Sequence, residues 1–152
     1  MIRLSTLAVG VAVVVAAVTA GVARSGERMQ QASVLHFYDK PGKTTVVDNA
    51  PKGKTRSAGD VLVFTNPVFT RHGGRVGTES GVCTVIRAKP YVAQCTATLQ
   101  IPGGQLMLQN LDTGASSYSM SVIGGTDEFS GANGMLASRS SGKSNTIDIT
   151  LK

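Results

Sequence analysis

Between residue 32 and the C-terminus, the sequence is a succession of short segments with β-strand character, separated by residues that form tight turns. The turns are marked by the same few residue types, at His72-Gly73-Gly74, Lys89-Pro90, Pro102-Gly103-Gly104 and Asp112-Thr113-Gly114. Apolar and polar residues alternate most clearly at the C-terminus, where Ile147, Ile149 and Leu151 are separated by polar residues. No long stretch has the 3.6-residue period of an amphipathic helix. This pattern predicts an all-β domain.

About eight segments of this kind can be distinguished, at residues 32–38, 60–69, 75–87, 91–101, 105–111, 117–123, 134–139 and 146–151. Because short turns join most consecutive segments, we expect neighbours to pair antiparallel. Eight such strands close most naturally into an up-and-down antiparallel β-barrel, which leaves no sheet edge exposed. A β-sandwich is the competing architecture. A barrel of eight strands has room for filling side chains or for one small ligand.

The composition agrees with a single β domain. The chain has 152 residues, 18 of them glycine, and no tryptophan, while charged residues make up 16%. These values exclude a collagen, a coiled coil and a charge-rich disordered chain. The length argues against an enzyme of several domains.

The N-terminal residues have the layout of a secretory signal peptide. Arg3 supplies a positive charge, residues 4–23 carry no charge, and charged residues return at Arg24. Small residues before and at Ala20 and Ala23 fit two cleavage points. We therefore expect a secreted or extracytoplasmic protein.

This layout divides the chain into a signal peptide at 1–23, a flexible leader at 24–31 and a β-barrel domain at 32–152. The alternative is an uncleaved membrane anchor, because about 20 apolar residues can span a bilayer. The weak hydrophobicity of the Ala- and Gly-rich segment favours the cleaved signal.

The net charge of +6 is concentrated in one region. Five cations lie before the first long strand, at Lys40, Lys43, Lys52, Lys54 and Arg56. They predict either a solvated loop face or a contact with an anionic polymer of the cell envelope. No nucleic-acid-binding motif accompanies them, so nucleic acid is not an expected partner.

The two cysteines have the spacing of a cross-strand pair. Cys83 and Cys95 lie six residues on either side of Lys89, which is in the turn between two predicted strands. Directly opposed residues of an antiparallel pair are close enough for a disulfide. Two buried free thiols are the alternative. CxxC spacing is absent and the chain has two histidines, so we expect no metal and no cofactor.

The order of several motifs resembles the allene oxide cyclase barrel and dirigent superfamily. The motifs are Gly59-Asp60 through Phe64-Thr65-Asn66, Gly81-Val82-Cys83, Cys95-Thr96-Ala97-Thr98, and Ile123-Gly124-Gly125-Thr126 with Phe129, Gly131 and Gly134. The resemblance covers residues 33–151. It implies an eight-stranded antiparallel barrel with a hydrophobic cavity, and a homo-oligomer, since the plant members are often trimers.

The resemblance also implies pocket residues. Phe64, Asn66 and Cys83 match positions in the pocket of the plant cyclases, and Asp39 matches a dirigent-type aspartate that could serve as an acid or base. His36 falls near the expected carboxylate of the cyclases, and Asp112 falls near their tyrosine. These departures argue against allene oxide cyclisation itself.

Three functions remain at this point. The first is a secreted dirigent-like barrel that binds a small apolar or aromatic molecule and steers its stereochemistry by confinement. The second is an isomerase or cyclase of the allene oxide cyclase type, acting on a fatty-acid or polyketide-like substrate. The third is a non-catalytic structural or envelope-binding protein. A cavity of a few hundred Å³ favours the first two, and a filled barrel favours the third.

Overall fold

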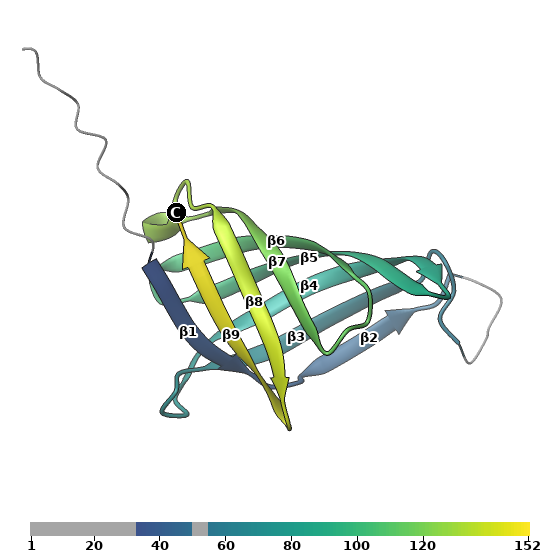
Figure 1. Ribbon diagram of the computed structural model, residues 1–152, viewed down its shortest axis with the longest axis horizontal. Helices are drawn as coiled ribbons and strands as arrows, with labels where there is room; N and C mark the ends of the chain where they lie inside the picture. Colours follow the sequence, from purple (N-terminus) through teal and green to yellow (C-terminus); the bar gives the residue numbers. More distant parts are fainter. Residues whose placement is uncertain (1–32, 50–54) are drawn as a thin grey trace, which may run out of the picture.

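The protein is a closed antiparallel β-barrel (Figure 1). The computed structural model describes residues 33–49 and 55–152. The predicted signal peptide and leader, together with Lys52 and Lys54, lie outside the described residues. The strands are β1 (Ser33–Asp39), β2 (Lys43–Val47), β3 (Val61–Phe69), β4 (Arg75–Ala88), β5 (Tyr91–Ile101), β6 (Gly104–Asp112), β7 (Ser117–Gly125), β8 (Gly134–Ser141) and β9 (Ser144–Leu151), with a 3₁₀ helix η1 (Asp127–Phe129) between β7 and β8.

Nine strand segments make an eight-stranded barrel because β1 and β2 occupy one strand position. β1 pairs with β9 along its whole length, and its last residues, Tyr38 and Asp39, also pair with β3. β2 continues along the same strand, from Lys43 opposite Thr65 onward. The eight-stranded up-and-down barrel predicted from the sequence is therefore confirmed, and the first strand is longer than expected.

The sequence pattern did not predict β2. All five of its residues are exposed. Because neither face of this segment is buried, its sequence, Lys-Thr-Thr-Val-Val, has no alternation of apolar and polar residues. The break between β1 and β2 falls at Pro41 and Gly42, where the chain passes close to β3. A Cβ atom at Gly42 would collide with the backbone carbonyl of Thr65. The turn residues of this segment are therefore an interruption within one barrel strand.

The two ends of the barrel differ in the size of the side chains that face inward. Along β5 the inward residues are Ala93, Cys95 and Ala97 in one half, then Leu99 and Ile101 in the other. The large residues pack with others that are almost fully buried, among them Val68, Leu106, Leu108, Leu136 and Ile149. The barrel is therefore filled at one end and leaves space at the other.

The 3₁₀ helix closes the filled end. It lies beside the first residues of β1 and the end of β9 (Figure 1), and Phe129 packs against the core. The backbone N–H of Glu128 donates to the carbonyl of Gly103 at 2.9 Å, which ties the helix to the turn before β6. Within residues 33–49 and 55–152, no helix is long and apolar enough to cross a membrane.

Candidate functional site

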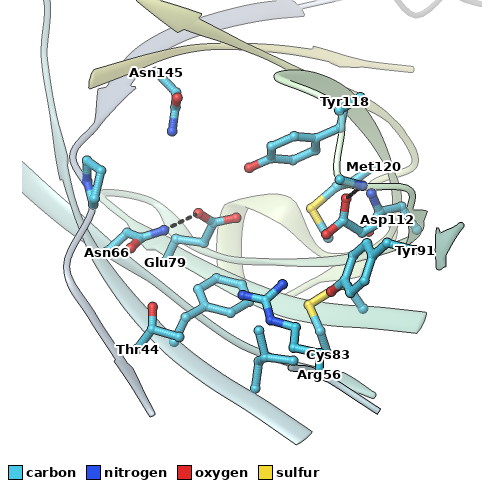
Figure 2. Close-up of a pocket in the computed structure, with 17 residues that line it drawn as sticks. Thr44, Arg56, Asn66, Glu79, Cys83, Tyr91, Asp112, Tyr118, Met120 and Asn145 are labelled. Carbon is cyan, nitrogen blue, oxygen red and sulfur yellow. Dashed lines mark hydrogen bonds between the residues drawn. A yellow bond between two sulfur atoms is a disulfide. The ribbon is translucent and has the colours of Figure 1, made fainter. Parts of the chain in front are cut away.

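A cavity of about 390 Å³ occupies the open end of the barrel (Figure 2). Its walls are mixed, with apolar side chains from four strands and a comparable number of polar groups. The apolar lining includes Leu62, Phe64, Cys83, Cys95 and Met120, and the polar lining includes Asn66, Glu79, Asn110, Asp112 and Asn145. Tyr91, Tyr118 and Arg56 complete the main features. A volume of this size accommodates one small organic molecule.

The disulfide predicted from spacing is present and forms part of the cavity wall. Cys83 on β4 is the register partner of Cys95 on β5, and their sulfur atoms are 2.04 Å apart. The two Cα atoms are 4.0 Å apart. In this oxidised state neither thiol is free to act in the pocket, so the Cys83 position supplies an apolar surface.

Glu79 is a titratable group on the inward face of β4. It is 1% exposed, and the side-chain amide of its register partner Asn66 donates to its Oε2 at 3.5 Å (Figure 2). Burial raises the pKa of Glu79 to about 7, the charge of Asp39 adds to the rise, and the hydrogen bond from Asn66 opposes it. Glu79 can therefore give or take a proton near neutral pH.

Asp39 is a second buried carboxyl group, at the end of β1. It is 0% exposed, and within the described residues neither carboxylate oxygen has a hydrogen-bond partner. Burial raises the pKa of Asp39, and the polar groups of Asn145, its register partner on β9, offset part of that rise. Asp39 does not line the cavity itself, but acts on it through the charge it presents to Glu79.

Tyr118 on β7 brings a hydroxyl group to the same region. Its phenol ring enters the cavity, with the oxygen directed toward the part of the lining that contains Glu79 (Figure 2). Burial raises the pKa of Tyr118 to about 12, and the charges of Glu79, Asp39 and Asp112 contribute further. The phenol therefore stays protonated at physiological pH and can donate a hydrogen bond to a ligand.

The mouth of the cavity is formed by Tyr91 and the loop that leads into β3. The guanidinium group of Arg56 lies 5.3 Å from the centre of the Tyr91 ring, in a cation–π contact. The ring also lies close to Gly114, where an added Cβ would be 3.3 Å from its Cδ1 atom. The loop itself is held by Asp60, which accepts hydrogen bonds from the backbone N–H and hydroxyl of Ser57 at 2.8 and 3.0 Å.

Of the residues singled out from the sequence, Phe64 and Asn66 line the cavity, Asp39 lies beneath it, and Asp112 is on its lining. His36 does not belong to this site. Its side chain is 41% exposed, and its Nδ1 is 2.6 Å from Oδ1 of Asp148 on the neighbouring strand.

The described basic residues that the sequence grouped in one region have different surroundings in the structure. Lys40 lies over the ring of Phe69, with Nζ 4.7 Å from its centre, whereas Arg56 lines the cavity mouth. The sequence reasoning missed Glu79, Tyr118 and Asn145. The two-residue period of a strand could have placed Glu79 on the inward face, because it has the same parity as Cys83 and Val85. These three residues are buried on β4, whereas positions 80, 82 and 84 are exposed. Within the described chain, no group of three His, Cys, Asp or Glu side chains is placed to hold a metal ion.

Residues 42–151 match the family model of the allene oxide cyclase barrel like domain. The chain belongs to this family. A search of curated proteins finds no match to this barrel. Solved structures that resemble it include a pyocyanin demethylase, with a TM-score of 0.69, 18% identity, and coverage of 79% of this chain and 100% of that one.

Two further structures have the same barrel. A pterocarpan synthase dirigent protein has a TM-score of 0.65 and 18% identity, and the match covers 80% of this chain and 84% of that one. An exo-specific intermolecular Diels-Alderase has a TM-score of 0.61 and 10% identity, with 79% and 97% covered. At these identities the likeness establishes a shared fold.

Proposed function

We propose that this barrel binds a small, mainly apolar or aromatic molecule in its open-end cavity and steers a reaction of that molecule by confining it. The observation that carries the proposal is a cavity of about 390 Å³ with apolar side chains from four strands and a buried carboxyl group, Glu79, on its lining. A filled barrel would have favoured a structural role, so the cavity supports a binding function over a purely structural one.

The chemistry available in the cavity is positioning together with proton transfer. Phe64 and the Cys83–Cys95 disulfide supply apolar surface that displaces water from a bound molecule. Glu79 is placed to exchange a proton with the ligand, and the Tyr118 hydroxyl is placed to donate a hydrogen bond to it. Neighbours with this fold are described as a dirigent protein, a demethylase and a Diels-Alderase, which is consistent with a barrel that hosts reactions of small molecules.

An isomerase or cyclase activity is the second candidate, and the buried carboxyl group favours it. An isomerisation that moves a proton needs an acid or base whose pKa lies near the working pH, and Glu79 meets that condition. We also propose that the protein works outside the cytoplasm, as its N-terminal sequence predicts. The disulfide supports maturation in an oxidising compartment.

A neutral aromatic probe tests the binding function. The chain has no tryptophan, so the fluorescence of bound 1-methylnaphthalene can be followed without a tryptophan background. We expect saturable binding, abolished by Ala115→Phe, which places a ring on the lining at the mouth. Thr113→Phe is the matched control, since Thr113 is exposed on the same loop and does not line the cavity.

Native mass spectrometry of the protein purified from its own host gives the second readout. Small molecules that co-purify with the wild type and are lost from Ala115→Phe would support the proposal. If 1-methylnaphthalene does not bind and no molecule co-purifies, the barrel does not have the proposed binding function.

A further inference from the structure

We propose that the natural ligand carries a positively charged nitrogen, and that this group binds at the inner part of the cavity against Glu79, with Asp39 behind it. The inference deepens the proposed function and rests on it. It assigns a substrate class, an aromatic or apolar molecule with a cationic nitrogen, to the open-end cavity.

The first argument is the charge balance below the cavity. Asp39 and Glu79 are 0% and 1% exposed, and within the described residues neither forms an ion pair. A buried carboxylate is costly unless a cation or several hydrogen bonds compensate it. Here no hydrogen bond of good geometry reaches the oxygens of Asp39, whose charge is stabilised in part by the polar groups of Asn145, and Glu79 has one long hydrogen bond from Asn66. The described residues therefore supply two buried acids without an ion-paired cation, and a ligand can provide the compensating charge.

Three described basic side chains contact groups other than the two acids. Lys40 stacks over Phe69, Arg56 stacks over Tyr91 at the mouth, and His36 pairs with Asp148. None of them forms an ion pair with Glu79 or Asp39. A positively charged group that enters through the mouth can therefore compensate the charge of Glu79 without displacing an ion-paired cation of the described residues.

The second argument is independent of the acids and concerns the walls. Three aromatic side chains, Phe64, Tyr91 and Tyr118, line the cavity. The faces of such rings attract cations, most strongly where water is excluded. The same rings stack on a flat aromatic ligand. An aromatic molecule with a cationic nitrogen would therefore use both features of the lining, and a neutral hydrocarbon would use the walls alone.

Protonation of the acids sets the pH dependence of this recognition. The titratable and charged groups around Glu79 are Asp39 on β1, Tyr118 on β7, Asp112 on β6 and Arg56 at the mouth. Tyr118 remains neutral, and Glu79 loses its proton as the pH rises through about 7. A bound cation favours the ionised carboxylate, so the affinity for a cation should rise over the same range.

A matched pair of probes tests the inference on the intact chain. The probes are N-methylquinolinium, which is a cation, and 1-methylnaphthalene, its neutral counterpart of nearly the same shape. At about pH 8 we expect the cation to bind at least about tenfold more tightly, and at about pH 5.5 we expect this preference to fall severalfold. Sodium 1-naphthoate, an anion of similar size, should bind most weakly.

Two variants identify the groups responsible. Glu79→Gln should reduce the preference for the cation to about threefold or less and remove its pH dependence, because it replaces the carboxylate with a neutral group of the same shape. Asp39→Asn should lower the pH at which the preference appears. Glu128→Gln, which neutralises an exposed carboxyl group at the closed end, is the matched control and should behave as the wild type.

The outcomes separate this inference from the proposed function. Binding of the neutral probe with equal or higher affinity than the cation at both pH values overturns the inference and leaves the binding function intact. A preference for the cation that is undiminished in Glu79→Gln also overturns it. If neither probe binds to the wild type, both the inference and the proposed function fail.

Discussion

The buried carboxyl group of Asp39 on β1 acts on that of Glu79 on β4, and its charge adds to burial in raising the pKa of Glu79 to about 7. The two residues are 40 positions apart in the sequence and come together because β1 closes the barrel against β3, which pairs with β4. Two buried acids of which one raises the pKa of the other cannot both ionise easily. The inner end of the cavity therefore holds a proton that responds to pH near neutrality.

Replacing Glu79 should change how stability depends on pH. The folded-state pKa lies above the ordinary value of 4.5, so the stabilising effect of the protonated form is complete below pH 4.5 and is lost as the pH rises through about 7. We expect the wild type to lose about 3 kcal/mol of unfolding free energy over that range through this group. Urea denaturation at about pH 5 and about pH 8 measures the loss.

Glu79→Gln should remove most of that loss and be more stable than the wild type at about pH 8. Glu128→Gln is again the control, because Glu128 is exposed and should leave the pH profile unchanged. If the unfolding free energies of the wild type and Glu79→Gln changed equally between these pH values, Glu79 would not be the group responsible.

The disulfide should contribute to stability as well as to the cavity wall. Closing the 12-residue separation between Cys83 and Cys95 is worth about 3 kcal/mol in the chain-entropy model. We expect reduction to lower the unfolding free energy of the wild type by about this amount. The variant with Cys83→Ser and Cys95→Ser should be insensitive to reductant. An unchanged wild-type melting temperature, with both thiols titrated as free, would count against this role.

Gly81 should not tolerate a side chain. It is the register partner of Phe64, and a Cβ atom at Gly81 would lie 2.7 Å from the Phe64 ring and 2.5 Å from the carbonyl oxygen of Thr96. We expect Gly81→Ala to cost roughly 1–3 kcal/mol and to displace the Phe64 ring, which weakens probe binding. Gly124→Ala is the control, since its Cβ would meet only the Met107 sulfur, at 3.7 Å. Thermal unfolding and the naphthalene titration measure both effects.

Asp60 should stabilise the mouth loop at neutral pH and lose this effect in acid. The backbone N–H of Ser57 is the main cause that holds the pKa of Asp60 below its usual 3.8. A lowered pKa contributes stability that is present above pH 3.8 and disappears as the pH falls through the folded-state value. We expect Asp60→Ala to be less stable than the wild type in urea at about pH 7, and the difference to shrink at about pH 3. A difference that stays constant across this range would show that the carboxylate charge is not responsible.

Sequence reasoning reached part of the candidate site. Phe64 and Asn66 were reached through the family resemblance, and both line the cavity. The same resemblance drew attention to His36, which the structure places on the outer surface, paired with Asp148. Adjacent residues of a strand face opposite sides of the sheet, so an alignment that is uncertain by one position exchanges the inside and the outside of a barrel.

The sequence by itself predicted most of the strand pattern, favoured a closed eight-stranded barrel over a sandwich and placed Cys83 opposite Cys95, because these depend on alternation, turns and local register. Only the tertiary structure decided which end of the barrel is filled, and that Asp39, Glu79 and Tyr118 act on one another. These three residues come from different strands and meet only when the sheet closes on itself. Their shifted pKa values follow from burial and mutual charge, which no single strand carries in its own sequence.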